Sequence, residues 1–450
     1  MEATMRKTLG AEAFGTENIT HLLFRLAPPV MLAQLIQALY NIVDSYFVGS
    51  FSSSGLTALS VVYPLQWLAT ALAVGIGTGV DTCMSMLNAM GEKEKSDKVA
   101  GCGNVSEVIA WFVYSLFILV FLPVYVKFSA NSPDVVEDSL TYGYIVCIGS
   151  IFLFLESDWA KIHQAEGNMK TPMIAECCGA LTNIVMDPVL IFGLGPVPRM
   201  GVAGAAYATV LGQAVAAAIA GRRAFRRIPP KDEIKGFCLR SLKLGYPTIL
   251  SQMTMSVYIV VLNLILARFS DSAVTVLGLY YKYQSFFFIP LLGLMTCMVP
   301  ILSYNYTAHS FERCRKLVKV TIVFSASLML IGMFCFCVIP EPLLGVFSRE
   351  ESVIATGVPA FRAIGLSFVS AVFSFLFPVF FQAIGESRKN TLLGLCRQIF
   401  CLIPSFYLLS FIGQDATWWA FLFSETVTGV VGIVLYVKEL GRWKRIEASS

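Results

Sequence analysis

Long apolar segments constrain the fold of this chain more than any other feature. A helix that crosses the hydrocarbon core of a bilayer needs roughly 20 apolar residues, and stretches of that kind recur along all 450 residues. With 56% hydrophobic and 14% charged residues, the chain differs from a soluble domain, in which about 25% of residues are charged. The sequence predicts an all-α integral membrane protein with twelve transmembrane helices, near 24–48, 57–86, 104–127, 139–163, 172–194, 201–221, 243–267, 274–303, 317–340, 358–383, 391–411 and 416–437.

The basic residues are distributed unevenly over the predicted loops. Of 33 Lys and Arg, 26 fall on the side that carries both termini and 5 fall on the other side or at its edge. Cytoplasmic loops are enriched in Lys and Arg, so this distribution predicts that both termini are cytoplasmic. The net charge of +4 is too balanced for a dedicated nucleic-acid binder, and no nucleic-acid partner is expected.

The two halves of the chain resemble each other at an offset of 218 residues. Residues 26–66 placed on 244–284 give 13 identities in 41 positions without a gap. Each half holds six predicted spans, an even number, so the repeat is parallel, with two six-helix lobes related by a pseudo-two-fold axis along the membrane normal. The expected domains are an amino-terminal lobe, an inter-lobe cytoplasmic linker and a carboxyl-terminal lobe at residues 1–221, 222–243 and 244–450.

A polar stripe follows one face of the first predicted span. Gln34, Gln37, Asn41 and Asp44 are separated by 3, 4 and 3 residues, which places them on the same side of a helix. A polar stripe inside a membrane must face protein or water rather than lipid. We therefore expect these side chains to line a polar pathway in the amino-terminal lobe.

The fifth and sixth predicted spans carry matching polar groups. Glu176, Asn183 and Asp187 share one helical face, and Thr209 and Gln213 lie one turn apart on the next span. Carboxylate, amide and hydroxyl oxygens are hard donors, so a converging set could hold a proton or a small cation such as Na⁺. The plainer alternative is that these groups hydrogen-bond neighbouring helices together.

The internal repeat provides a control for this acidic set. At the offset of 218, Asp44 corresponds to Leu262 and Asp187 to Ser405, so the second half keeps the scaffold without these acids. The acids are therefore not needed to build a six-helix lobe. Ionisable groups inside spans are costly, which favours a role in ion coupling.

Pro28 and Pro29 lie near the start of the first predicted span. Proline removes a helix hydrogen bond and bends the helix, so Pro29 is a candidate for helix bending beside the polar stripe. A bend at this point could link cation binding to helix shape. The alternative is a purely structural kink.

Other charged residues fall within or near the predicted spans. Lys282, Arg397 and Glu425 belong to the second half, where each could contact a substrate or could instead pair with another residue or reach the interface. Lys282 is retained as a candidate member of the polar pathway. The acids expected to be solvated near helix ends are Asp81, Glu156 and Asp158.

Four segments of the first half resemble the multidrug and toxic compound extrusion (MATE) family. They are NIVDSYFVG at 41–49, QAEG at 164–167, NIVMDP at 183–188 and GVAGAAYAT at 201–209. The resemblance extends over the whole chain through the parallel repeat of six spans. It implies a multi-pass transporter of the plasma (inner) membrane that exports cationic amphiphilic compounds in exchange for H⁺ or Na⁺.

The resemblance also implies particular site residues. In the prokaryotic branch with a cation site in the amino-terminal lobe, the matching positions are Asp44, Asn183, Asp187 and Thr209, and Pro29 matches the bending proline. Another branch carries a glutamate in the seventh span. Residues 243–267 contain no acid, which argues against that coupling scheme.

The sequence thus predicts a secondary active multidrug efflux antiporter that works by alternating access, as a monomer and without a cofactor. Its partners would be small-molecule drugs or toxic cations and the lipid bilayer. A flippase of lipid-linked oligosaccharides is the nearest alternative, but its cavity would need several basic residues to hold pyrophosphate, and only Lys282 and Arg397 are available. No nucleophile, base or metal-ligand cluster suggests an enzyme.

Overall fold

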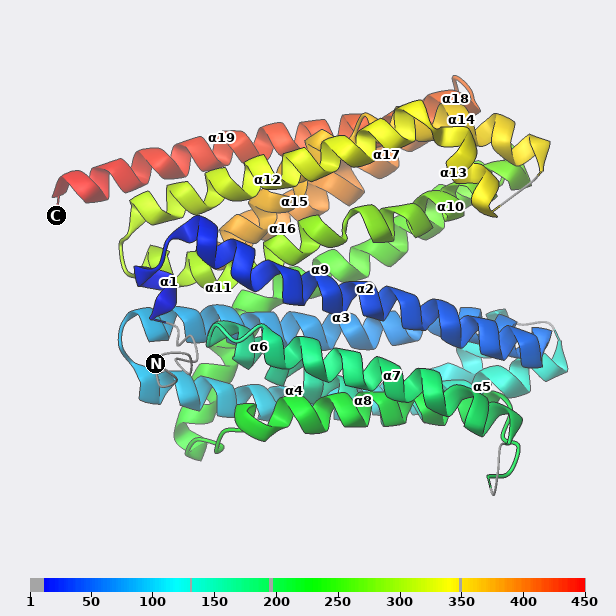
Figure 1. Ribbon diagram of the computed structural model, residues 1–450, viewed down its shortest axis with the longest axis horizontal. Coiled ribbons are helices and arrows are strands. Elements are labelled where there is room, and N and C mark those ends of the chain that lie inside the picture. The colour runs from blue at the N-terminus through cyan, green and yellow to red at the C-terminus, as the bar shows by residue number, and fades with distance from the viewer. Residues whose placement is uncertain (1–11, 130–131, 194–196, 348–349, 450) are drawn as a thin grey trace, which may run out of the picture. The chain divides into compact units, whose positions relative to one another are not determined.

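The computed structural model describes residues 12–129, 132–193, 197–347 and 350–449. Within those residues, 11 helices are long and apolar enough to cross a membrane, or 12 when one bent pair counts as a single span. The predicted twelve-helix, all-α membrane fold is therefore confirmed. Figure 1 shows the helices in chain order from blue to red.

Five helices of the first half each form one of the predicted spans, and the fourth span is built from two helices. Long apolar runs keep the backbone helical because every backbone polar group must be satisfied within its own segment. The elements are α1 (Ala13–Thr16), α2 (Ile19–Phe51), α3 (Ser53–Ala89), α4 (Lys93–Ser129), α5 (Pro133–Gly149), α6 (Ile151–Ala165), α7 (Lys170–Phe192) and α8 (Val202–Ala224).

The second half is more often interrupted than the first. Its tenth span consists of two helices that bend by 53° at a short break. Its eleventh span contains a π-helical segment, η2. The elements are α9 (Lys231–Leu266), α10 (Asp271–Phe287), α11 (Ile289–Thr307), α12 (Phe311–Val338), α13 (Pro340–Phe347), α14 (Glu351–Gly365), α15 (Phe368–Ala383), α16 (Ser387–Leu395), η2 (Cys396–Leu402), α17 (Ile403–Ser410), α18 (Gln414–Thr417) and α19 (Trp419–Ser449).

The chain divides into two compact units. Unit 1 contains residues 1–16 and 28–249, and unit 2 contains residues 17–27 and 250–450. Helix α2 passes from unit 2 to unit 1 at Pro28, and α9 passes from unit 1 to unit 2 just after Pro247, the counterpart of Pro29 in the repeat. Both helices remain continuous through these prolines. Residues 225–230, within the segment expected to be a linker, connect α8 to α9.

Local backbone geometry repeats at the same offset as the sequence. Ser52 caps α3 by accepting a hydrogen bond from the Gly55 amide at 3.2 Å, and Ser270 caps α10 by accepting one from the Ala273 amide at 3.1 Å. A left-handed residue follows each of two further helices in both halves, with φ of 73° and 54° at Gly91 and His309 and of 81° and 80° at Gly167 and Gly385. The duplication therefore includes caps and turns as well as hydropathy.

Three glycines let α3 pack closely on two neighbours within unit 1. A Cβ at Gly75 or Gly79 would collide with α9, whereas a Cβ at Gly77 would press on Lys161 and on the backbone of α6. Residues that are two positions apart face different sides of a helix, so the Gly-x-Gly-x-Gly pattern serves two interfaces. The pattern is thus a packing device inside a helix and does not form a phosphate-binding loop.

Candidate functional site

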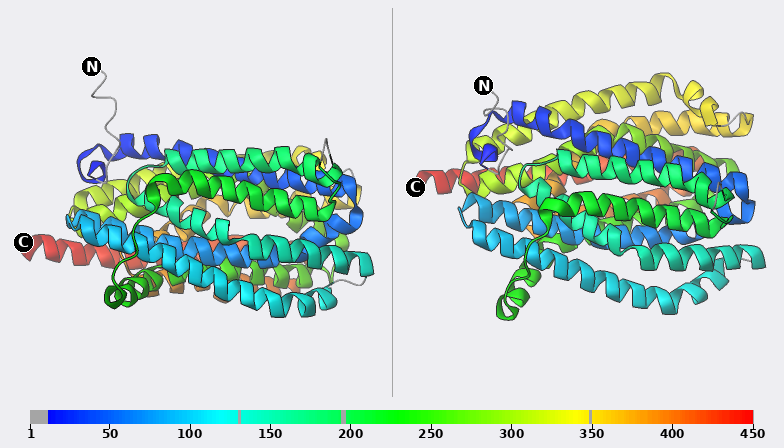
Figure 2. Two further views of the ribbon diagram at one scale, coloured as in Figure 1. Left: turned by 90° about the horizontal axis from the view of Figure 1, so that it is seen from below. Right: turned by 60° about the horizontal axis from the view of Figure 1, so that its bottom comes forward.

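Helices α7 and α8 form the base of the candidate site. They lie side by side in both views of Figure 2, and Gly179 and Gly212 face each other so closely that a Cβ on either would press on the other's carbonyl oxygen. Gly204 approaches the backbone of α7 in the same way, at Leu190. Small residues therefore allow the two backbones to come close, as expected for helix packing in membranes.

This close packing brings polar side chains of α7 and α8 together. The Asn183 amide Nδ2 lies 3.4 Å from Asp187 Oδ1 and 3.5 Å from Thr209 Oγ1, and both of these oxygens can accept from it. Thr209 also donates to the Ala205 carbonyl oxygen at 3.1 Å. All three side chains are buried, so their polar groups depend on one another rather than on bulk water.

A second helix contributes the opposing carboxyl group. Asp44 on α2 is buried and lies within hydrogen-bonding range of the fully buried Asp187 on α7. Two ionised carboxylates repel each other, so such a contact requires a proton or another cation between them. One oxygen of each carboxyl group and Oδ1 of Asn183 are buried without a hydrogen-bond partner. These atoms are free to receive that cation.

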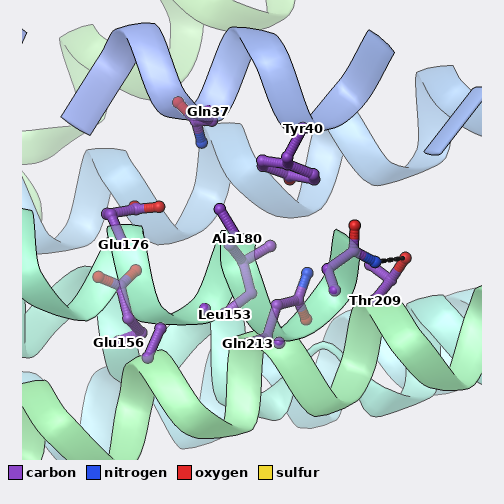
Figure 3. Close-up of a pocket in the computed structure, with 12 residues that line it drawn as sticks. Gln37, Tyr40, Leu153, Glu156, Glu176, Ala180, Thr209 and Gln213 are labelled. Carbon is purple, nitrogen blue, oxygen red and sulfur yellow. Dashed lines mark hydrogen bonds between the residues drawn. The ribbon is translucent and has the colours of Figure 1, made fainter. Parts of the chain in front are cut away.

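A cavity of about 50 Å³ continues from this polar group along α7. Figure 3 shows Gln37 and Tyr40 pointing from α2 toward α7. A volume of this size holds a few water molecules or a small ion. The polar residues that line it are Gln37, Tyr40, Glu156, Glu176, Asn183, Thr209 and Gln213.

The structure therefore places three residues of the predicted polar pathway at one site in unit 1. Gln37, Glu176 and Gln213 line the cavity, whereas Gln34 is only partly buried and does not line it, although its Oε1 is buried without a partner. The side chain of Asn41 lies outside the described part of the structure. Pro29 lies within α2, close to the residue at which that helix changes units.

Two tyrosines belong to the site but escaped the sequence analysis. Tyr40 lines the cavity and precedes Asp44 by one helical turn, so its spacing could have identified it. Tyr142 on α5 is buried within hydrogen-bonding range of Thr209 and Gln66. Nothing in the local sequence indicates that Tyr142 would reach α8, because that contact depends on the packing of distant helices.

The expectation that Asp81, Glu156 and Asp158 are solvated is wrong. All three are buried, and Glu156 lines the cavity. The expectation placed them near the predicted span ends at residues 86 and 163 and took those ends to be exposed to water, but α3 ends at Ala89 and α6 at Ala165. Each residue therefore lies about two turns inside its helix, where neighbouring helices cover it.

The charged residues of the second half belong to unit 2 and are arranged differently. Arg397 Nε donates to Glu425 Oε1 at 2.9 Å, and the guanidinium lies 3.8 Å from the centroid of the Phe375 ring. The Lys282 side chain is exposed, with Nζ 5.2 Å from the centroid of the Phe347 ring. Pairing, the plainer alternative for Arg397 and Glu425, is thus what the structure shows.

Comparison with known families identifies the duplicated unit. The MatE family model matches residues 29–189 and again residues 247–408. The two matches begin 218 residues apart, which agrees with the offset of the internal repeat. Together they cover well over half of the chain.

Curated relatives and solved structures match over nearly the full length. The multidrug export protein MepA of Staphylococcus haemolyticus is 24% identical over 434 residues, covering 94% of each chain. MepA of Staphylococcus aureus strain MRSA252 is 22% identical and covers 90% of this chain and 91% of its own.

Among solved structures, an outward-facing multidrug resistance MATE family transporter superposes with a TM-score of 0.90 at 22% identity, covering 98% of this chain and 100% of the other. A mutant of the Vibrio cholerae MATE transporter VcmN gives a TM-score of 0.88 at 20% identity, covering 94% and 97%. At these identities the superpositions establish the shared fold.

Proposed function

The chain belongs to the MatE family of membrane transporters, and from this premise we propose that it is a secondary active multidrug efflux antiporter. It exports cationic amphiphilic compounds in exchange for inward movement of H⁺ or Na⁺. Full-length similarity to multidrug export proteins supports the class of substrate. Because the members of this family are transporters, the chain is not an enzyme.

The observation that carries the proposal is the contact between Asp44 and Asp187. Their carboxyl groups come from different helices and lie in hydrogen-bonding range inside a membrane-spanning bundle. Burial of negative charge in that environment costs several kcal/mol unless a cation compensates it. A transporter that couples to a cation gradient uses this dependence, because the site is stable only when it is loaded.

Asn183 and Thr209 complete the cation site in this proposal. The Asn183 amide lies within 3.5 Å of both Asp187 and Thr209, so it can orient the carboxyl group that receives the ion. For a proton the amide donates toward Asp187. For Na⁺ it would turn its oxygen toward the ion, since amide oxygens are suitable ligands for hard cations.

Helix α2 transmits occupancy of the site to the rest of the protein. It carries Asp44 in unit 1, and its first turns, up to Ala27, belong to unit 2. Loading of the site removes the negative charge that faces α2 from α7, and the helix can then bend at Pro29, where hydrogen bonds are missing. This change in α2 alters access to the substrate path and releases the drug outward.

The remaining features of the proposal concern placement in the cell. The transporter lies in the plasma (inner) membrane as a monomer, with both termini cytoplasmic. The uneven distribution of Lys and Arg over its loops supports that orientation. The proposed domains remain an amino-terminal lobe, the segment 222–243 as connection and a carboxyl-terminal lobe.

Efflux of a fluorescent cation from proteoliposomes tests this function. Ethidium movement is recorded under a pH gradient alone, a Na⁺ gradient alone and no gradient, for the unchanged protein and for D187N. We expect one gradient to drive efflux in the unchanged protein and neither to do so in D187N. D415N, which changes an exposed carboxylate of unit 2, is the matched control. Full gradient-driven efflux by D187N would contradict the proposal.

A further inference from the structure

Unit 1 contains a second group of buried acids that the coupling site does not use. Asp81 on α3, Glu107 on α4 and Asp158 on α6 are each fully buried. Both carboxylate oxygens of Glu107 and of Asp158, and one oxygen of Asp81, are buried without a hydrogen-bond partner. A buried polar group of this kind in a native protein requires an explanation.

The packing of α4 on α6 brings two of these acids, Glu107 and Asp158, together. A Cβ on Gly103 of α4 would collide with both oxygens of Asp158, so the glycine leaves room for that carboxylate. Glu107 follows Gly103 by one turn on the same face of α4 and interacts electrostatically with Asp158. Helices α4 and α6 thus bring two acids together. Within the described residues, neither acid forms an ion pair with a basic residue.

Asp81 approaches the same region from α3. It follows Gly77, which packs against Lys161 and the backbone of Asp158, by one helical turn. The Ser85 hydroxyl lies 3.4 Å from Asp81 Oδ1, and the ammonium of Lys161 interacts electrostatically with Asp81. Asp81 therefore faces α6 beside Lys161.

Lys161 and Glu156 connect this group with the cavity. Lys161 interacts electrostatically with Glu156 as well as with Asp81. Glu156 interacts in turn with Glu176, and both of these acids line the cavity that reaches Asn183 and Thr209. Titratable groups thus extend from the coupling site through α6 to the acids on α3 and α4.

The far side of the group lies beside the basic segment between α8 and α9. Asn104 Nδ2, one turn before Glu107 on α4, lies 3.4 Å from the Arg226 carbonyl oxygen, and its Oδ1 accepts from Trp159 Nε1 at 2.7 Å. The Arg226 guanidinium pairs with Asp97 and Glu166. The acids therefore lie between the cavity and the charged residues at this end of unit 1.

The second repeat shows that helix packing does not need these acids. At the offset of 218, Asp81 corresponds to Val299, Glu107 to Ser325 and Asp158 to Leu376, all of which are buried. Equivalent positions of the same scaffold are thus filled by apolar or hydroxyl side chains. Unit 1 therefore keeps these costly buried carboxyl groups for a reason other than helix packing.

We propose that Asp81, Glu107 and Asp158 form a second proton-binding site, which takes protons from the coupling site through Glu176, Glu156 and Lys161 and passes them to the end of the lobe beside residues 225–230. Because none of these acids has an ion-pair partner within 4.0 Å in the described residues, each step passes through a bridging water, which accepts one proton from the donor acid or ammonium group while it gives one to the next carboxylate or amine, with no other bond changed. The inference rests on the proposed antiport function and assigns H⁺ as its coupling ion.

The test compares E107Q and D158N with D187N in ethidium-loaded proteoliposomes. Two readouts are taken: efflux driven by a pH gradient, and exchange of ethidium for ethidium without a gradient, which moves no net proton. We expect E107Q and D158N to slow pH-driven efflux at least about tenfold, since positioned proton-transfer groups contribute factors of that order or more. Exchange should remain within about twofold of the unchanged protein, because the substrate path is intact.

Two control variants separate proton transfer from packing. S115A removes a buried hydroxyl of α4 that also lacks a hydrogen-bond partner. A serine hydroxyl does not ionise at physiological pH, so we expect no effect on either readout. E107D keeps a carboxyl group at the position and should restore most of the efflux. If E107Q folds poorly, D81N provides the same test on α3.

Four outcomes of this experiment would contradict the inference or the function on which it rests. Unchanged pH-driven efflux in E107Q and D158N, with D187N inactive, would overturn the second site and leave the antiport function standing. Equal loss of efflux and exchange would show that these acids serve packing only. Efflux by the unchanged protein that responds to Na⁺ alone would reject protons as the cargo of this site. Full efflux by D187N would remove the proposed function itself.

Discussion

The two repeats share a scaffold but treat buried acids in opposite ways. Unit 2 has two buried acids, Glu425 and Glu439, in its described residues, and they pair with Arg397 at 2.9 Å and Lys389 at 3.1 Å. Unit 1 has six, and within the described residues none of them has an ion-pair partner within 4.0 Å. The six are Asp44, Asp81, Glu107, Glu156, Asp158 and Asp187.

This difference separates two uses of charge inside a membrane. In a buried ion pair each charge neutralises the other, so the pair holds its helices in one arrangement and requires no ion from solution. An unpaired buried acid is stable only with a proton or cation that can arrive and leave. Under the proposed function, unit 1 therefore has the changing, ion-dependent role, whereas the Arg397 and Glu425 pair of unit 2 keeps a constant electrostatic state.

The largest expected effect follows from neutralising Asp44, the proposed coupling acid on α2. D44N should reduce gradient-driven ethidium efflux by about 100-fold or more, because the cation site then lacks one of its two charges. Thermal stability in detergent should not fall. The measurement is initial efflux rate in proteoliposomes together with a melting curve. A variant that melts well below the unchanged protein would instead make Asp44 a structural residue.

The second-largest expected effect is the loss of stability when the ion pair between Arg397 and Glu425 of unit 2 is broken. E425Q leaves the Arg397 guanidinium, whose side chain is only 14% exposed, without its carboxylate and should destabilise the protein by about 3–5 kcal/mol. Replacing both partners, as in R397M combined with E425L, should recover most of that loss, because no charge then remains buried alone. Melting curves of R397M, of E425L and of the double variant form the double-mutant cycle, and E425Q is measured beside them. Additive losses would show that the pair does not act as a unit.

A smaller effect is expected when residues are exchanged between the repeats. D81V introduces the residue that stands at the equivalent position of unit 2 and should raise the free energy of unfolding by about 1–3 kcal/mol, since a buried unpartnered group is removed. V299D makes the opposite change and should destabilise by a similar amount or more. Denaturation of both variants in the same detergent provides the comparison. A stabilising V299D would show that the two positions are not equivalent environments.

The smallest effect sets the scale for exposed pairs. Arg315 and Glu447 of unit 2 lie 3.0 Å apart with side chains 35% and 38% exposed. R315A should change stability by less than about 1 kcal/mol, because water screens such a pair. The effect should shrink further at high ionic strength. A loss as large as that of E425Q would contradict the distinction between buried and exposed ion pairs.

Several structural features could be predicted because they depend on nearby residues. Hydropathy located all twelve spans, although the structure lengthens most of them and divides the fourth, eighth, tenth and eleventh. Helical spacing placed Gln37, Glu176 and Asn183 on faces that the structure turns into one cavity. The repeat at an offset of 218 recurs in the caps at Ser52 and Ser270.

Other features could not be predicted, because they arise where distant helices meet. Glu156 has the same local surroundings whether α6 ends in water or is covered by α7, and only packing places it in the cavity. The same holds for Tyr142, which reaches Thr209 from α5, and for Lys282, which remains exposed beside Phe347. The helical period in a sequence shows which residues share one face of a helix, but it does not show which other helix packs against that face.

The amino-acid sequence by itself determined the class of protein, the number of membrane-spanning segments and the duplication, and it predicted the polar residues of the proposed cation site. These follow from apolar length, from spacing along a helix and from self-similarity, all of which are properties of the linear chain. The tertiary structure decided which acids have a counter-charge: Glu425 meets Arg397, whereas Glu107 and Asp158 meet each other. The energy of a buried charge depends on its spatial neighbours, and those neighbours are set by helix packing.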